Sequence, residues 1–261
     1  MADDTQRPVA IVSGSARGIG AACARRLAAE GFDLVVNYTR SAEAAEATAR
    51  ACRAAGAAAV VVQGDVADDA ECVALVAAAE QSWGRLDVLV NNAGVTRFGD
   101  PADLATLDAD DFARVFAVNV TGAYQLSRAA APLLGASPFG AIVNISSHSG
   151  FSGIGSSIAY AASKGALNTL TLSLARALAP AVRVNAVCPG FVDTQWLAGR
   201  FDDDALVALK RRTAEIAPLR RLVSPAEVAE AVSWFALGGR SITGQLLVID
   251  GGTHLTLGDP L

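Results

Sequence analysis

The sequence predicts an α/β protein built on a doubly wound parallel β-sheet, with helices on both faces of the sheet. The chain has 261 residues, of which 52% are hydrophobic, enough for one large domain with a substantial core. Short apolar runs alternate with longer helix-like stretches along the chain. Such alternation is typical of parallel sheets, because two parallel strands need a crossover connection between them. No linker, repeat or low-complexity block divides the chain, so we expect a single domain over 1–261.

About seven runs have the composition of strands that are covered on both faces, because they are apolar almost without interruption. They lie at 7–14, 32–38, 58–64, 86–92, 140–146, 182–188 and 245–250. The stretches between them that look helical lie at 18–30, 41–55, 68–83, 108–134 and 157–179. Gly31 and Gly56 stand where C-caps would end two of these helices. Ser224, Pro225 and Glu227 form a capping-box pattern that starts another.

Composition excludes several classes of partner. With 18% charged residues and a net charge of −5, the chain offers no basic surface for nucleic acid. No apolar run approaches the ~20 residues of a membrane-spanning helix, and the polar N-terminal segment is unlike a secretory signal. The four cysteines are scattered without a C-x-x-C pair, which favours reduced thiols in the cytoplasm. His148 and His254 lie far apart in the sequence and predict no metal site.

A glycine-rich turn follows the first predicted strand and opens the first predicted helix. In "SGSARGIG" (13–20), Gly14, Gly18 and Gly20 keep the turn free of Cβ atoms. A pyrophosphate can then approach the backbone N–H groups at the positive end of the helix dipole. The pattern alone is also compatible with a tight turn and close helix packing. Its position after strand one of an alternating chain favours dinucleotide binding.

Polar and small residues also gather where other predicted strands end. Asp65 and Val66 follow the third strand, 91–94 the fourth, and "PGFVDT" (189–194) the sixth. Open parallel sheets bind their ligands at this edge. Each segment could be ordinary turn chemistry, but their convergence on one edge predicts a binding site.

A tyrosine and a lysine stand four residues apart in "SIAYAASKGALN" (157–168), a stretch otherwise rich in small residues. On a helix this spacing places Tyr160 and Lys164 on one face, about one turn apart. The residues alone leave two interpretations open, a solvated surface pair and a proton-transfer pair.

Taken together, these segments resemble the short-chain dehydrogenase/reductase family over about Val9 to Gly252. The matching pieces are "SGSARGIG", "GDV" (64–66), "NNAG" (91–94), "VNV" (118–120), "NISS" (144–147), "YAASK" (160–164) and "PGFVDT". Ser13 departs from the threonine that is usual in the family but keeps the hydroxyl. The resemblance implies a Rossmann-type fold in one dinucleotide-binding and catalytic domain, with a substrate lid inserted around 195–223.

The same resemblance implies a catalytic set of Asn119, Ser147, Tyr160 and Lys164. Tyr160 matches the general acid/base, and Lys164 matches its partner, whose ammonium should lower the pKa of the phenol. Ser147 matches the serine that hydrogen-bonds the reacting oxygen; its spacing from the tyrosine selects it over Ser146. Asn119 matches the asparagine that organises a water and proton relay. With this set complete, the proton-transfer interpretation is favoured over the surface pair.

The resemblance also implies a nicotinamide dinucleotide. The expected contacts are Gly14, Ser15, Arg17, Gly18, Ile19, Gly20, Tyr38, Arg40, Ser41, Asp65, Val66, Asn92, Ala93, Gly94, Tyr160, Lys164, Pro189, Gly190, Val192 and Thr194. Tyr38 stands where NAD-preferring members usually carry aspartate, and two arginines could clamp a 2′-phosphate. We therefore expect NADP(H), with NAD(H) not excluded.

The substrate is expected to be a small carbonyl or alcohol compound bound by Ser147, His148, Ser149, Tyr160 and Trp196. The chain looks closest to 3-oxoacyl-(acyl-carrier-protein) reductases, which makes a 3-oxoacyl thioester one candidate. However, Ala141 replaces one of the two arginines with which those enzymes bind the carrier protein; Arg176 matches the other. A sugar or polyol dehydrogenase and a non-catalytic dinucleotide sensor remain as alternatives. Family members commonly pair the helices at 108–134 and 157–179 between subunits, so we expect a homotetramer or homodimer.

Overall fold

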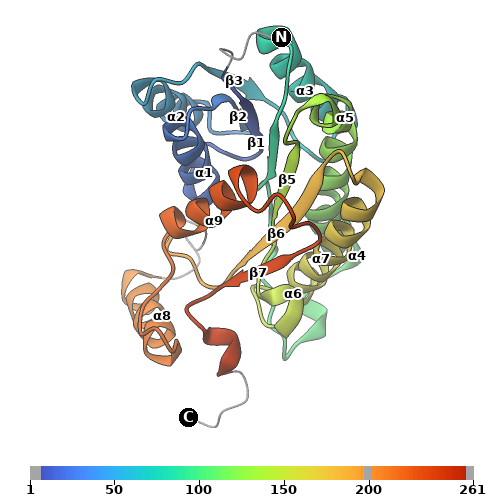
Figure 1. The fold of residues 1–261 in the computed structure, drawn as a ribbon. Helices are drawn as coiled ribbons and strands as arrows, with labels where there is room; N and C mark the ends of the chain where they lie inside the picture. Colours follow the sequence, from blue (N-terminus) through green and yellow to red (C-terminus); the bar gives the residue numbers. More distant parts are fainter. Residues whose placement is uncertain (1–6, 195, 197–201, 257–261) are drawn as a thin grey trace.

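The computed structural model describes residues 7–194, 196 and 202–256 and contains the parallel sheet that the sequence predicts (Figure 1). Within these residues, seven parallel strands follow the order β3-β2-β1-β4-β5-β6-β7. They are β1 Val9–Val12, β2 Asp33–Tyr38, β3 Ala59–Gln63, β4 Val88–Asn91, β5 Ala141–Ile145, β6 Arg183–Pro189 and β7 Leu246–Ile249. Each lies in a predicted run to within two residues, so the predicted fold class is confirmed.

The helices cover both faces of the sheet (Figure 1). Within the described residues they are α1 Gly18–Ala29, α2 Ala42–Ala54, α3 Asp69–Trp83, α4 Ala109–Phe116, α5 Ala123–Ala136, α6 Ser149–Ser152, α7 Ile158–Leu178, α8 Asp203–Ile216 and α9 Pro225–Leu237. Short 3₁₀ turns lie at Leu104–Thr106 and Thr253–Leu255. Side chains of α1, α2 and α9 pack on one face, and those of α3, α5 and α7 on the other. None of these helices has the length and apolarity to span a bilayer.

The predicted long helix at 108–134 is interrupted by a wider turn. Between α4 and α5, the segment Ala117–Gly122 is π-helical. Gly122 lies against the end of β3, where a Cβ atom on it would stand 2.7 Å from Val66 Cγ2. The apolar pattern of the sequence gives no sign of this π-helical turn. The turn places Asn119 inside the molecule.

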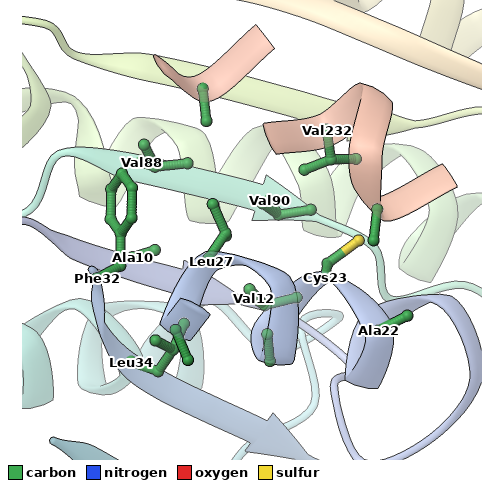
Figure 2. Packing of buried hydrophobic residues seen from close by; sticks show 14 of the residues in the cluster. Ala10, Val12, Ala22, Cys23, Leu27, Phe32, Leu34, Val88, Val90 and Val232 are labelled. Carbon is green, nitrogen blue, oxygen red and sulfur yellow. The ribbon is translucent and has the colours of Figure 1, made fainter. Parts of the chain in front are cut away.

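The core consists of two apolar layers, one on each face of the sheet. Figure 2 shows the layer in which Leu27 of α1 and Val232 of α9 lie on the same side of the sheet as Val88 and Val90 of β4. Phe32, fully buried, packs edge-on against Phe139 with ring centroids 6.5 Å apart. Because both faces are covered in this way, only the ends of the strands are available for a ligand.

The predicted helix ends are also observed. Gly31 and Gly56 follow α1 and α2 with φ values of +95° and +90°, a region in which glycine has no steric penalty. At the start of α9, the Ser224 side chain accepts from the Glu227 N–H, and the Glu227 carboxylate accepts from the Ser224 N–H. Pro225 occupies the first turn, where its missing N–H leaves no bond unmade.

The Ser224→Ala substitution should lower the free energy of unfolding by about 1 kcal/mol, because it removes the capping oxygen of α9. Urea denaturation followed by circular dichroism measures the change. Ser82→Ala, at an exposed position inside α3, is the control and should change the stability by less than about 0.5 kcal/mol. Equal effects of the two substitutions would contradict the capping role.

Candidate active site

A cleft of about 1140 Å³ runs along the carboxyl edge of the sheet, over the ends of β1 to β6. Most of the residues predicted to form the site line it. They are Gly14, Arg17, Gly18, Ile19, Gly20, Tyr38, Arg40, Ser41, Asp65, Val66, Asn92, Ala93, Gly94, Ser147, His148, Ser149, Tyr160, Lys164, Pro189, Gly190, Val192, Thr194 and Trp196. Ser15 and Asn119 do not line the cleft.

The glycine turn forms a backbone cradle at one end of the cleft. Gly14 and Gly18 adopt φ values of +61° and +57°, and a Cβ atom on Gly20 would lie 2.5 Å from the Gly14 oxygen. The first turn of α1 has no side-chain cap and no acidic residue, so its N–H groups remain available for an anion. The cradle therefore fits the pyrophosphate of a dinucleotide.

Ser15 departs from the prediction because its hydroxyl faces the interior. Its Oγ donates to the Val12 oxygen (2.7 Å) and accepts from the Asn37 N–H (3.0 Å). Its backbone N–H also donates to the Asn37 oxygen. Ser15 thus ties the turn to β2, and its hydroxyl and its N–H are both engaged within the protein.

Two asparagines hold the cradle in place. Asn92 Nδ2 donates to the oxygens of Ser13 (2.9 Å) and Gly14 (3.0 Å). Asn37 Oδ1 accepts from the Gly14 N–H (2.9 Å), while its Nδ2 donates to the Gly64 oxygen (3.0 Å). The sequence analysis did not single out Asn37, although it is a polar residue directly after the apolar run 34–36.

Beyond the cradle, the cleft carries a cluster of arginines. Arg17 and Arg40 are exposed and have no ion-pair partner in the described part of the chain. Arg114, which the sequence analysis missed, pairs with Asp65 at 2.9 Å. Burial alone would raise the pKa of Asp65, but the Ala67 N–H and Arg114 lower it. Asp65 therefore stays ionised, with one carboxylate oxygen engaged by Arg114.

The predicted pair on α7 lies at the centre of the cleft. Ser157 caps this helix by accepting from the Tyr160 N–H (3.1 Å). Lys164 is 4% exposed; its Nζ donates to the Ile145 oxygen (2.8 Å) and lies 5.6 Å from the centroid of the Tyr160 ring. A lysine so deeply buried excludes the interpretation as a solvated surface pair.

The pKa of the tyrosine differs from the expectation. Burial raises the pKa of Tyr160 to about 12, although its hydrogen bond with Ser147 lowers it. Burial also lowers the pKa of Lys164 to about 8. The net shift of the phenol pKa is therefore opposite to the expected lowering, because loss of solvent is the largest effect at both groups.

The two neighbouring serines have different partners. Ser147 Oγ donates to Ser149 Oγ (3.1 Å), accepts from the Ser149 N–H (3.1 Å) and interacts with Tyr160. Ser146 Oγ instead donates to Asn168 Oδ1 (2.6 Å) in the core. The Ser147 hydroxyl therefore lies beside the phenol, whereas the Ser146 hydroxyl does not.

Asn119 has a supporting position behind the cleft. Its Oδ1 accepts from the Val95 N–H (2.8 Å), and its Nδ2 donates to the Val95 oxygen (3.0 Å) and to Ser163 Oγ (3.0 Å). With its amide satisfied in this way, Asn119 holds the loop after β4 against α7.

The opposite end of the cleft is formed by His148, Ser149 and Trp196. The Trp196 ring lies 6.1 Å from the Tyr160 ring, centroid to centroid, and its side chain is 45% exposed. The neighbouring apolar residues Leu197 and Phe201 lie outside the described residues. His148 Nδ1 faces the carboxylate of Asp250, which the sequence analysis missed. The sequence signal that could have identified Asp250 is its position directly after the last predicted strand.

Replacing the buried lysine should change how stability depends on pH. In the unfolded chain Lys164 titrates at 10.5, and in the folded chain at about 8. Between these values the unfolded state holds more protons, so the lysine's contribution to stability increases with pH. The free energy of unfolding of the wild type, minus that of Lys164→Met, should rise by about 3 kcal/mol from pH 8 to 10.5. Guanidinium denaturation at several pH values measures it, and a flat difference would contradict the burial of this group.

Comparison with known proteins agrees with this geometry. A family model described as enoyl-(acyl carrier protein) reductase matches residues 14–254. A ketoacyl reductase assigned to the granaticin polyketide synthase of Streptomyces violaceoruber is 44% identical, over 97% of this chain and 98% of that protein. The cis-4-hydroxycyclohexanecarboxylate dehydrogenase of Sinomonas cyclohexanicum is 40% identical, over 94% and 95%.

A solved structure is equally similar. A Burkholderia xenovorans protein assigned to the short-chain dehydrogenases/reductases is 42% identical and superposes with a TM-score of 0.89, covering 97% of this chain and all of the other. Members of this family are dehydrogenases and reductases that act on CH–OH or carbonyl groups with a nicotinamide cofactor. With the cleft, the glycine cradle and these matches in agreement, the chain belongs to the short-chain dehydrogenase/reductase family.

Proposed function

We propose that the protein is an NADP(H)-dependent oxidoreductase that interconverts a carbonyl group and a secondary alcohol. The observation that carries the proposal is the meeting of Ser147, Tyr160 and Lys164 in the same cleft as the glycine cradle. The cofactor, when bound, would supply or accept the hydride at the reacting carbon.

The roles of the side chains follow from their positions. The pKa of about 12 keeps Tyr160 protonated at neutral pH, so its phenol can donate a proton to the oxygen of a carbonyl as that oxygen gains charge. Ser147, hydrogen-bonded to the phenol, can donate to the same oxygen. Lys164 is held beneath the ring by the Ile145 oxygen, where its charge would favour the phenolate that forms. Asn119 holds the loop after β4 against α7, the helix that carries Tyr160 and Lys164.

Cofactor binding is assigned to the cradle and the arginine cluster. The turn Gly14–Gly20 would hold the pyrophosphate, and 189–194 would hold the nicotinamide end. Arg17, Arg40 and Ser41 would bind a 2′-phosphate through charge-assisted hydrogen bonds. The Ser41 hydroxyl makes no capping hydrogen bond to α2. This set supports a preference for NADP(H) over NAD(H).

The substrate is assigned only by class, a small carbonyl or alcohol compound. The similarity to a ketoacyl reductase supports a 3-oxoacyl thioester, and the similarity to a hydroxycyclohexanecarboxylate dehydrogenase supports a free alcohol or ketone. Ala141 is buried in β5 and presents no group to a carrier protein. We therefore propose a substrate that enters without a carrier protein.

We also propose that the protein assembles with further copies of itself and works in the cytoplasm. Part of the small-residue face of α7 packs within the chain, because Gly165 lies against Gly150 of α6. Tyr124 of α5 and Leu172 of α7 remain exposed and would suit pairing with a second copy, in a homodimer or homotetramer. The described cysteines are free and buried, consistent with the cytoplasm. The segment around 195–223, which includes Trp196, would act as the substrate lid.

The Tyr160→Phe substitution should lower kcat at least 100-fold, because it removes the transferable proton and leaves the ring in place. The assay is NADPH oxidation with an acetoacetyl thioester, simple ketones and keto sugars. Tyr124→Phe, on the exposed side of α5, is the matched control and should retain activity. Binding of NADPH, followed by fluorescence, should persist in both variants. Substantial turnover by Tyr160→Phe, or loss of its NADPH binding, would contradict the assigned role.

The double substitution Arg17→Ala/Arg40→Ala should weaken NADPH binding about 10- to 100-fold and leave NADH binding within about twofold, since charge-assisted hydrogen bonds to the 2′-phosphate are lost. Fluorescence titration with both dinucleotides measures the effect. The control is Arg50→Ala, which removes one positive charge outside the cleft. It should change neither NADPH binding nor NADH binding. Parallel losses for NADPH and NADH would refute the phosphate clamp.

A further inference from the structure

Two histidines that are far apart in the sequence meet at one buried carboxylate. The Asp250 side chain, 1% exposed, follows β7 and accepts from the N–H groups of Gly252 (2.9 Å) and His254 (2.8 Å). His254 Nδ1 lies 2.9 Å from both carboxylate oxygens. On the other side, His148 Nδ1 lies 3.6 Å from Asp250 Oδ2. Among the described residues no group of His, Cys, Asp or Glu side chains is arranged for a metal ion, so another role is needed.

The carboxylate determines which nitrogen of His148 carries the proton. His148 Nδ1 is buried and has no hydrogen-bond partner in the described part of the chain. If this nitrogen presented its lone pair, the lone pair would face the negative charge of Asp250, which is unfavourable. The proton therefore belongs on Nδ1, and in a neutral imidazole Nε2 is then the acceptor.

Both groups keep the charge states that this assignment needs. Burial lowers the pKa of His148, although Asp250 raises it, so the imidazole is neutral at neutral pH. Burial alone would raise the pKa of Asp250, but hydrogen bonds from His254 and Gly252 lower it, and the carboxylate stays ionised. The imidazole of His254 also faces the carboxylate and disfavours a charge on His148.

The histidine is held rigidly at the wall of the cleft, next to Ser147. Its backbone N–H donates to the Pro189 oxygen (2.9 Å), and a Cβ atom on Gly190 would lie 2.5 Å from Asp250 Cβ. The cofactor loop, the histidine and the aspartate are thus packed together. The 17% of the His148 side chain that is exposed lies on the cleft. No described residue bonds its Nε2.

We propose that His148 binds the substrate by accepting, at Nε2, a hydrogen bond from a hydroxyl group close to the reacting carbonyl carbon. The preferred substrate class is then a hydroxyketone, or the corresponding diol, and Asp250 is the positioning residue for the imidazole. An acceptor selects a donor, and a ketone without a hydroxyl has none to offer. The proposal rests on the proposed oxidoreductase function and specifies the substrate of the same site.

The test compares 4-hydroxy-2-butanone with 2-butanone, and hydroxyacetone with acetone, in NADPH-dependent reduction. The wild type should prefer the hydroxylated member of at least one pair by about 10- to 100-fold in kcat/KM, since an unfilled buried acceptor discriminates against the analogue. In His148→Phe this ratio should fall to about one, and His148→Gln, which keeps an acceptor, should retain part of it. Tyr124→Phe, outside the cleft and away from Asp250, is the control and should keep the wild-type ratio.

A second measurement reads the tautomer directly. In ¹⁵N-labelled protein the two histidines are distinguished with His254→Phe, and long-range ¹H–¹⁵N spectra show which ring nitrogen of His148 is protonated. The expected result is protonation at Nδ1, with a shift of the proton towards Nε2 in Asp250→Asn. This readout would not move if Asp250 only stabilised the fold.

Each failure has its own meaning. A wild-type ratio near one in both pairs, an unchanged ratio in His148→Phe, or protonation at Nε2 would overturn the role of His148. An unchanged tautomer in Asp250→Asn would overturn the positioning role of Asp250. Inactivity on every carbonyl tested would instead refute the oxidoreductase function, and the inference about the substrate would fall with it.

Discussion

The cleft depends on the hydrogen bonds from Asn92 to the oxygens of Ser13 and Gly14. Where parallel strands end, their backbone groups lose the partners of the ladder and must find others. Asn92 supplies them for β1, Asn37 links the same turn to β2 and β3, and Asn119 holds the loop after β4. Side-chain amides thus replace the missing backbone partners at the edge of the sheet. These hydrogen bonds keep the glycine cradle in its shape.

Burial then controls the chemistry of the groups on this edge. The pKa of Tyr160 is raised, and the pKa values of Lys164 and His148 are lowered, for the same reason: the charged forms lose contact with water. A protonated phenol and a neutral imidazole on neighbouring walls of one cleft provide a donor and an acceptor. The proposed preference for a hydroxyketone uses both.

Much of the fold and part of the site were predictable from the sequence. The apolar runs located the seven strands, because strands covered on both faces need continuous hydrophobicity. The π-helical turn at Ala117–Gly122 has no mark in the apolar pattern, and its Gly122 packs against Val66, a residue far away in the chain. The hydroxyl of Ser15 matched the motif, yet its orientation depended on Asn37, a residue of another strand.

By itself, the sequence determined the local features: the strand and helix periods, the glycine turn, the helix caps, and the spacing that brings Tyr160 and Lys164 to one face. These depend on residues that are near each other in the chain. Tertiary structure alone decided the pKa direction of Tyr160, the pairing of Asp65 with Arg114, and the meeting of His148 with Asp250. Desolvation and charge pairing depend on neighbours in space, and no local pattern records which distant residues those neighbours are.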